Sequence, residues 1–149
     1  MKIIIIGGVA GGMSAATRLR RLMEDDEIVI FEKGPFVSFA NCGLPYYISG
    51  EIAERDALLV QTPESLKARF NLDVRPFHEV VKISPEEHTV TVAHDGSEFT
   101  EQYDKLILSP GAKPFIPEIE GLQVGKRIHT SETLMDLEEF PESLAILGS

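Results

Sequence analysis

Short, continuous apolar runs along the chain predict strands that are buried on both faces. The first run spans residues 2–6 and ends abruptly at Gly7-Gly8. Residues 27–31 predict a second strand, and residues 104–108 predict another apolar strand. Such runs are typical of parallel sheets, because helices cover the faces of a parallel sheet.

Between the first two runs, apolar residues recur at the spacing of a helix, at Met13, Ala16, Leu19 and Met23. Strand, glycine-rich turn, helix and strand follow one another within about thirty residues, which is the size of a parallel βαβ unit. We therefore predict an α/β fold of the Rossmann type.

The middle of the chain alternates apolar and polar residues, which predicts half-buried strands. A short strand is expected over residues 72–75, and further strands are expected over 80–84, 89–93 and 99–103. The last three predict an antiparallel β-meander inserted as a crossover.

Capping residues predict two more helices. One is expected over residues 62–70 with Thr62 as its N-cap, and another over residues 131–140 with Ser131 as its N-cap. Residues 34–50 are expected to form a loop with one or two helical turns.

The pattern of Ile3 to Gly7 returns at Leu144 to Gly148. The second copy resembles the first strand of another nucleotide-binding unit. We expect residues 1–143 to form one α/β domain and residues 144–149 to begin a second one, within a longer protein.

Composition argues against several classes of protein. The formal net charge of −10 argues against nucleic-acid binding, which would need a basic face. The longest purely apolar run, Ile3–Ile6, is too short to span a bilayer, and no secretory signal pattern is present.

The histidines show no metal-ligand spacing, so we predict no metal site. A single cysteine without a signal leads us to expect a cytoplasmic protein.

The turn Gly7-Gly8-Val9-Ala10-Gly11-Gly12 follows a strand and opens a helix. Backbone amides in such a turn can approach a pyrophosphate at the positive helix N-terminus. The dinucleotide fingerprint requires glycine at the first, third and sixth places, and Val9 replaces the middle glycine. Glu32 follows Gly12 by 20 residues and supplies the acid that binds the ribose in such units. The motif predicts a dinucleotide but does not distinguish FAD from NAD.

Cys42 is the only cysteine, so it cannot form an internal disulfide. Redox chemistry at this thiol needs a small molecule, a peroxide or oxygen, or another chain as its partner. At the start of a short helix, the sulfur would lie near unpaired amides, which favour the thiolate. The alternative is a buried structural cysteine, the commonest state of a free thiol.

Five segments together resemble one known family. They are Gly7–Gly12, Arg18–Arg21, Phe31–Lys33, Ser38–Tyr47 (SFANCGLPYY) and Tyr103–Ala112 (YDKLILSPGA). The chain is similar to coenzyme A-disulfide reductases, which are members of the pyridine nucleotide-disulfide oxidoreductase superfamily with a single redox cysteine. NADH oxidases and NADH peroxidases are close relatives.

The resemblance implies an FAD-binding domain in residues 1–143 and the first strand of an NAD(P)H-binding domain in residues 144–149. The full-length protein would use NADH or NADPH and form a homodimer. For Val80, a place in the strand core is an equally good interpretation. The residues implied in FAD binding are Gly7, Gly8, Ala10, Gly11, Gly12, Glu32, Lys33, Val80, Ser109, Pro110 and Gly111.

The same resemblance implies that Cys42 is the redox nucleophile and forms a mixed disulfide with coenzyme A. The substrate would be CoA disulfide or a CoA persulfide. Arg18 and Arg21 share one helix face and are spaced to bind its phosphates, although a solvated basic face is the alternative. The residues implied in substrate binding are Ser14, Arg18, Arg21, Ser38 and Asn41.

Two alternatives stay open. Oxidases and peroxidases of the family usually carry histidine at the position of Ala10 and cycle the cysteine through a sulfenic acid. The alanine therefore favours disulfide or persulfide reduction. The other alternative is a dinucleotide-binding module with an inert cysteine. We expect residues 1–149 alone to show no complete turnover and to bind FAD weakly or not at all.

Overall fold

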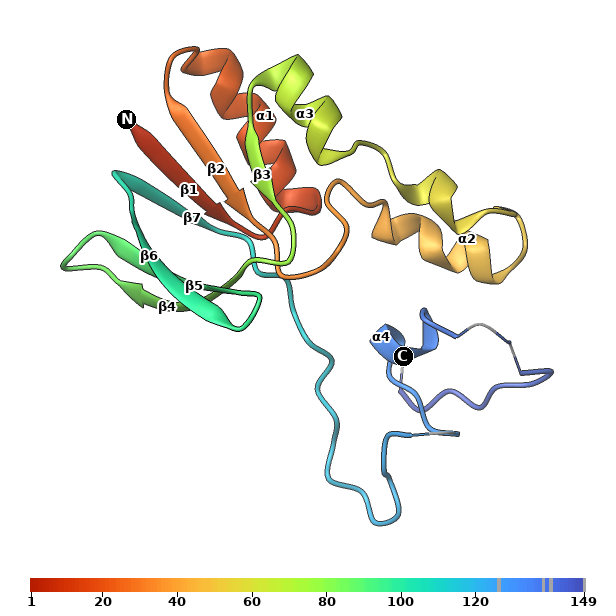
Figure 1. Cartoon of the computed structure of the whole chain (residues 1–149). Coiled ribbons are helices and arrows are strands. Elements are labelled where there is room, and N and C mark those ends of the chain that lie inside the picture. Colours follow the sequence, from red (N-terminus) through yellow and green to blue (C-terminus); the bar gives the residue numbers. More distant parts are fainter. Residues whose placement is uncertain (126, 138, 140, 149) are drawn as a thin grey trace.

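Four parallel strands form a sheet in the order β3-β2-β1-β7 (Figure 1). The computed structural model describes residues 1–125, 127–137, 139 and 141–148. The apolar runs thus form the predicted parallel sheet of a Rossmann-type α/β fold. The strands are β1 (Lys2–Ile6), β2 (Glu27–Phe31), β3 (Asp73–Arg75) and β7 (Lys105–Leu108).

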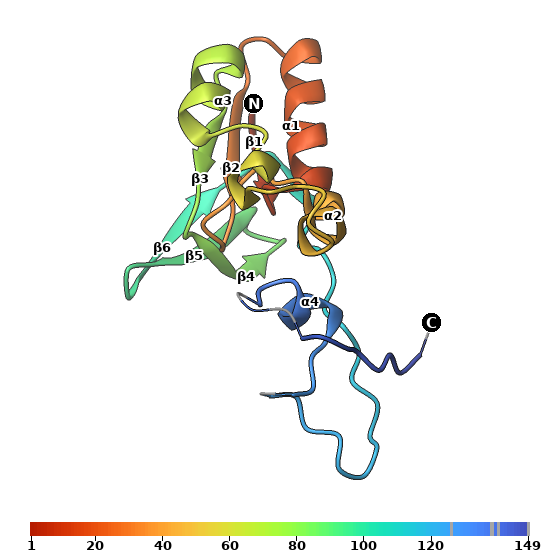
Figure 2. The same ribbon diagram turned by 90° about the vertical axis from the view of Figure 1, so that its right-hand side faces the viewer.

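Two helices, α1 (Ala10–Leu22) and α3 (Pro63–Phe70), cover one face of this sheet (Figures 1 and 2). Met13 of α1 and Leu66 of α3 join the buried side chains of Ile3 and other strand residues in one core cluster. Thr62 caps α3, as predicted: its side chain accepts from the Ser65 amide while the Ser65 side chain accepts from the Thr62 amide.

The antiparallel meander covers the opposite face. Its strands are β4 (Glu79–Ser84), β5 (Thr89–His94) and β6 (Ser97–Gln102), in that order. Val90 and Val92 of β5 pack against Ile4 of β1. Because side chains alternate along a strand, Ile4 faces the meander while Ile3 and Ile5 face the helices. The fold therefore has three layers, and β1 is buried on both sides.

The segment that carries the cysteine is a chain of short helical turns joined to the end of the sheet. It contains η1 (Asn41–Gly43), α2 (Leu44–Ile48) and η2 (Arg55–Leu58). The amide of Ser38 donates to the carbonyl of Gly8 at 2.9 Å, which ties this segment to the glycine-rich turn.

The helix predicted over residues 131–140 is wrong in length and in cap. α4 spans only Ser131–Leu134, and Thr130 is its N-cap through reciprocal bonds with Thr133. None of the α4 residues is buried, so no packed face extends the helix. Phe140, the predicted last residue, lies outside the described residues.

The strand predicted at the end of the chain is also wrong. Residues 144–147 are irregular, and Ile146 and Leu147 are exposed. A strand needs a partner for its backbone hydrogen bonds, and no strand of the described chain pairs with this segment. The division into two domains at residue 144 stays a prediction. No helix in the described ranges is long and apolar enough to cross a membrane.

Candidate functional site

The glycine-rich turn is too tightly packed for side chains at two positions. A Cβ at Gly12 would lie 1.8 Å from the carbonyl oxygen of Gly7. A Cβ at Gly7, where φ is +97°, would lie 2.0 Å from the carbonyl oxygen of Ser109. No side chain caps the N-terminus of α1, and its first turn holds no acid. The turn therefore presents a positive helix end to an anion.

Glu32, the residue after β2, accepts hydrogen bonds that connect this turn to the end of the strand. Its Oε2 accepts from the amide of Gly8 at 2.8 Å, and its Oε1 accepts from the amide of Gly34 at 2.8 Å. The Gly8 amide is thus already paired, so the anion-binding capacity lies at the start of α1. Each carboxylate oxygen keeps a further lone pair for a ligand hydroxyl.

The structure brings other predicted cofactor residues to the same place. Ser109 follows β7, and its hydroxyl would lie 3.4 Å from a Cβ at Gly11. Pro110 and Gly111 continue from it. Lys33 is exposed after Glu32. Val80 packs against the meander-side core, so its side chain is a strand core residue, and a backbone role toward a cofactor stays a prediction.

Cys42 lies in the η1 turn and is exposed, so the alternative of a buried structural thiol is wrong. Two of the amides that follow it are already paired, so they are not free to stabilise the thiolate. The Gly43 amide donates to the Ala40 carbonyl at 2.8 Å, and the Leu44 amide donates to the Asn41 carbonyl. The turn uses its own amides to close itself, as short 3₁₀ turns do.

A cleft of about 670 Å³ borders the Cys42 segment on one side. This volume is within the usual range for small-molecule sites. Arg55 and Asp136 form an ion pair at its edge, with Nη2 of Arg55 2.6 Å from Oδ1 of Asp136. The lining residues are Val9, Gly34, Pro35, Phe36, Phe39, Asn41, Leu44, Arg55, Ala112, Lys113, Pro114, Ser131, Glu132, Met135 and Asp136.

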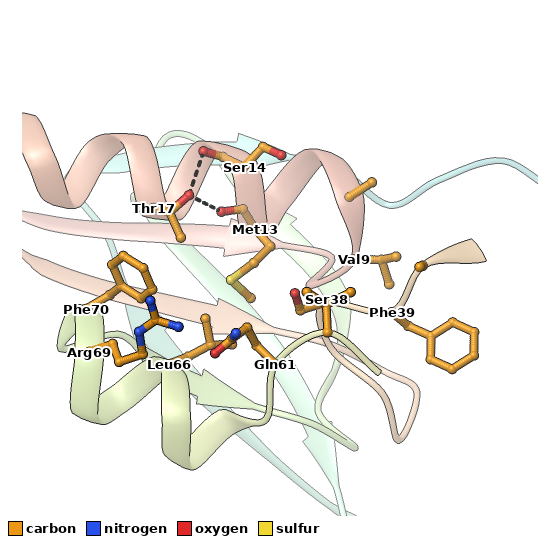
Figure 3. A pocket seen from close by; sticks show the side chains of 13 residues that line it. Val9, Met13, Ser14, Thr17, Ser38, Phe39, Gln61, Leu66, Arg69 and Phe70 are labelled. Atoms are coloured by element: carbon orange, nitrogen blue, oxygen red, sulfur yellow. Dashed lines mark hydrogen bonds between the residues drawn. The ribbon is translucent and has the colours of Figure 1, made fainter. Parts of the chain in front are cut away.

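A second pocket, of about 350 Å³, lies between α1 and α3 (Figure 3). Its walls are apolar at Met13, Leu66 and Phe70. The hydroxyl of Thr17 donates to the Met13 carbonyl at 3.0 Å and lies 3.2 Å from the Ser14 carbonyl (Figure 3). The other lining residues are Val9, Ala10, Ser14, Ser38, Phe39, Ala40, Val60, Gln61 and Arg69.

The predicted substrate residues fall into three groups. Ser14 and Ser38 line the helix pocket together, whereas Asn41 lines the larger cleft. Arg18 and Arg21 are exposed on α1 and line neither pocket.

The arginine between them is structural. Nε of Arg20 donates to the Phe70 carbonyl at 2.9 Å, and Nη2 donates to the Asn71 carbonyl at 3.0 Å. This residue joins the C-terminal ends of α1 and α3.

Sequence reasoning missed the site residues that come from other elements, namely Arg55, Asp136, Gln61 and Arg69. No motif marks them, because only the packing of η2, α3 and the α4 segment brings them to the pockets. It also missed that the rings of His78 and His94 stack with centroids 3.8 Å apart. The described residues hold no group of three or more metal-ligating side chains.

A family model described as "Pyridine nucleotide-disulphide oxidoreductase" matches residues 1–149. The chain belongs to this family. The prediction from the sequence motifs is thereby confirmed at the level of the family and of its Rossmann-type fold. Pyridine nucleotide-disulphide oxidoreductases are enzymes, and the glycine-rich turn and exposed cysteine described above are features of this chain that fit such chemistry.

Among curated relatives, the chain is similar to a coenzyme A disulfide reductase of Staphylococcus haemolyticus (strain JCSC1435), with 49% identity over 113 residues. A coenzyme A disulfide reductase of Staphylococcus aureus (strain JH9) is 48% identical over 113 residues. Each match covers 74% of this chain and 26% of the relative. The chain thus spans about a quarter of the length of these relatives.

Solved structures of the family share the fold. Reduced CoADR-RHD of Bacillus anthracis is 59% identical, with a TM-score of 0.76 over 79% of this chain and 22% of that chain. A NAD-dependent persulfide reductase from A. fulgidus is 38% identical, with a TM-score of 0.78 over 81% of this chain and 23% of that chain. The water-forming NADH oxidase from Lactobacillus brevis is 32% identical, with a TM-score of 0.75. The match covers 81% of this chain and 27% of that chain.

Proposed function

We propose that this chain is the N-terminal part of an FAD-dependent, NAD(P)H-linked reductase that acts on CoA disulfide or a CoA persulfide through Cys42. One observation carries the proposal: the exposed Cys42 lies on a segment that borders two separate pockets. Phe39 lines both pockets, while Ala40 lines the helix pocket and Asn41 the larger cleft. The residues next to Cys42 thus border one pocket that would take a substrate and one cleft that would take a cofactor.

The residues at the glycine-rich turn fit a dinucleotide. The close approach of Gly7 and Gly12 leaves space for a pyrophosphate at the uncapped start of α1. Glu32 would bind the adenosine ribose, and Ser109 to Gly111 would pass beside the dinucleotide. When bound, FAD would accept a hydride from NAD(P)H and supply electrons to the Cys42 sulfur.

Cys42 would act as the nucleophile. Its thiolate attacks one sulfur of a CoA disulfide, which forms a mixed disulfide on Cys42 and releases the other half as a CoA thiolate. Ser14 and Ser38 would contact the substrate from the helix pocket. Arg18 and Arg21 would bind its phosphates from the exposed face of α1.

The names of the relatives support this substrate class, since coenzyme A disulfide reductases and a persulfide reductase are among them. We extend the proposal to the whole protein as a cytoplasmic homodimer that uses NADH or NADPH. The strongly acidic net charge of −10 supports a small-molecule substrate over nucleic acid.

Intact mass analysis of the full-length protein under nonreducing conditions tests the proposal. We expect a CoA adduct on Cys42 that a reductant removes, and NAD(P)H oxidation that depends on CoA disulfide. Cys42→Ser should lack both. Rapid turnover of oxygen or peroxide with no response to CoA disulfide would overturn the proposal.

A second candidate is an NADH oxidase or peroxidase, which the similarity to the Lactobacillus brevis oxidase favours. Such an enzyme would cycle Cys42 through a sulfenic acid. Dimedone labelling of Cys42 during turnover with oxygen or peroxide would select this candidate.

A further inference from the structure

Leu58 is a buried side chain that the two core clusters of the fold do not account for. It is the buried residue of η2 and is only 3% exposed. Neither core cluster of the described residues includes it. A buried leucine in a surface turn packs against a neighbouring segment, and here that segment is the turn that carries Cys42.

Leu58 contacts the cysteine turn on both sides of Cys42. Before Cys42, the Ala40 amide donates to the Leu58 carbonyl at 2.8 Å. After Cys42, the side chain of Leu58 lies against Gly43, where a Cβ would lie 2.4 Å from Cδ2 of Leu58. One residue therefore holds the turn just before and just after the thiol.

The backbone next to Leu58 is fixed to the same segment. Phe39 and Leu59 form an isolated antiparallel bridge, and the Val60 amide donates to the Ser38 carbonyl at 3.1 Å. The Ser38 amide in turn donates to the Gly8 carbonyl. Continuous backbone bonds thus join the end of η2, the cysteine segment and the glycine-rich turn, so the leucine side chain has a defined place beneath the cysteine turn.

Glycine at position 43 leaves the space that this side chain occupies. Gly43 has φ of −85° and ψ of −13°, which any residue adopts without strain. The need for glycine here is therefore one of space rather than of conformation. A methyl group at Gly43 would displace Leu58, because a buried leucine has little free volume around it.

We propose that Leu58 is a positioning residue for Cys42: its side chain fills the space beside Gly43 and sets where the thiol lies relative to the glycine-rich turn. The effect on turnover rests on the proposed function, in which the Cys42 sulfur meets both a cofactor and a substrate. In such a site a displacement of about 1 Å can slow the reaction about 100-fold. The position of the thiol itself can be measured without that function.

The test moves one carbon atom across the contact in the full-length protein. Gly43→Ala adds a carbon on one side, Leu58→Val removes a carbon on the other, and the double variant restores the total. Leu72→Val is the matched control, because Leu72 is fully buried in the core cluster under α1 and α3 and lines neither pocket.

Iodoacetamide alkylation of Cys42, followed by mass spectrometry of its peptide, reports the state of the turn and needs no substrate. We expect Gly43→Ala and Leu58→Val each to speed alkylation about threefold, at the low end of coupling between residues in contact. The double variant should alkylate at the wild-type rate. Leu72→Val should lower the melting temperature and leave the alkylation rate unchanged.

Steady-state kinetics with CoA disulfide report the effect on turnover. Each single variant should lower kcat about tenfold with little change in KM, because the turn moves while the residues proposed to bind substrate on α1 stay in place. The double variant should recover most of the wild-type kcat. Leu72→Val should keep the wild-type kcat despite its lower melting temperature.

The outcomes separate this inference from the proposed function. If the double variant alkylates as fast as the single variants, or if Leu72→Val changes alkylation as much as Leu58→Val, the positioning role is overturned. If the alkylation series behaves as expected but the wild type does not reduce CoA disulfide, the proposed function fails and the role of Leu58 stands. Should Gly43→Ala not fold, Leu58→Val against Leu72→Val decides the question.

Discussion

The Gly8 amide donates a 2.8 Å hydrogen bond to Oε2 of Glu32. The sequence motif assigns these residues to different parts of a dinucleotide, the pyrophosphate and the ribose. The structure shows that they also support each other, because the acid at the end of β2 holds the turn at the end of β1. Loss of the acid should therefore affect both stability and cofactor affinity.

Glu32→Ala should lower the free energy of unfolding by about 2 kcal/mol, since it leaves the amides of Gly8 and Gly34 without their charged acceptor. In the full-length protein it should also weaken FAD binding by at least about tenfold. Urea denaturation and flavin fluorescence titration measure the two effects. Glu86→Ala, at an exposed turn between β4 and β5, is the control and should change neither.

Gly12→Ala should destabilise the chain by more than about 2 kcal/mol, because the new methyl group would lie 1.8 Å from a backbone oxygen. The backbone of Gly7 cannot move without disturbing β1. Thermal unfolding checks this expectation. Gly125→Ala, where a Cβ meets no atom within 4 Å, is the matched control. Equal melting temperatures for the two variants would contradict the packing argument.

Glu101 joins the meander to the parallel sheet. Its two carboxylate oxygens lie 2.7 Å from Nζ of Lys2 and 2.8 Å from Nη1 of Arg75. Its side chain is only 12% exposed, so Glu101→Gln should destabilise the fold by about 2 kcal/mol, between the values for exposed and buried ion pairs.

The loss in Glu101→Gln should depend on pH. Burial lowers the pKa of Lys2, but the hydrogen bonds that Lys2 donates to Glu101 and Glu27 outweigh it, so the pKa is raised above its ordinary value of 10.5. A raised pKa contributes stability that is fully present below pH 10.5 and is lost as pH rises through the folded-state pKa. The difference between wild type and Glu101→Gln should therefore shrink above pH 10.5 in urea titrations. A difference that grows with alkaline pH would contradict this sign.

The ion pair of Arg55 and Asp136 should restrain the cysteine turn. Arg55 begins η2, and Leu58 at the end of η2 accepts from the Ala40 amide at 2.8 Å. Arg55→Glu should place like charges together, loosen this connection and speed the alkylation of Cys42 by iodoacetamide about twofold, as expected for an exposed pair.

The charge-swapped variant with Arg55→Glu and Asp136→Arg should return the alkylation rate to that of the wild type. Asp136→Arg alone should resemble Arg55→Glu. If the swapped variant alkylates as fast as the single variants, the pair does not restrain Cys42.

The elements that were predicted well depend on local signals. The runs at residues 2–6 and 27–31 are so apolar that only a doubly covered strand accommodates them. Thr62 and Ser65 cap α3 through bonds that span three residues. The predictions over residues 131–140 and 144–147 failed because each needed a packing partner, which the local pattern does not supply.

The sequence by itself determined the family, the parallel sheet with its inserted meander, the glycine-rich turn and the single cysteine. The family follows from the resemblance of short motifs to a known family, and the other features follow from residue type and spacing within short stretches. Only the tertiary structure decided that Glu32 bonds to Gly8, that Cys42 is exposed beside residues that line two pockets, and that Arg69 lines the same pocket as Ser14 and Ser38. The physical reason is that these relationships join elements far apart along the chain, and packing of α1 and α3 on the sheet sets their distances.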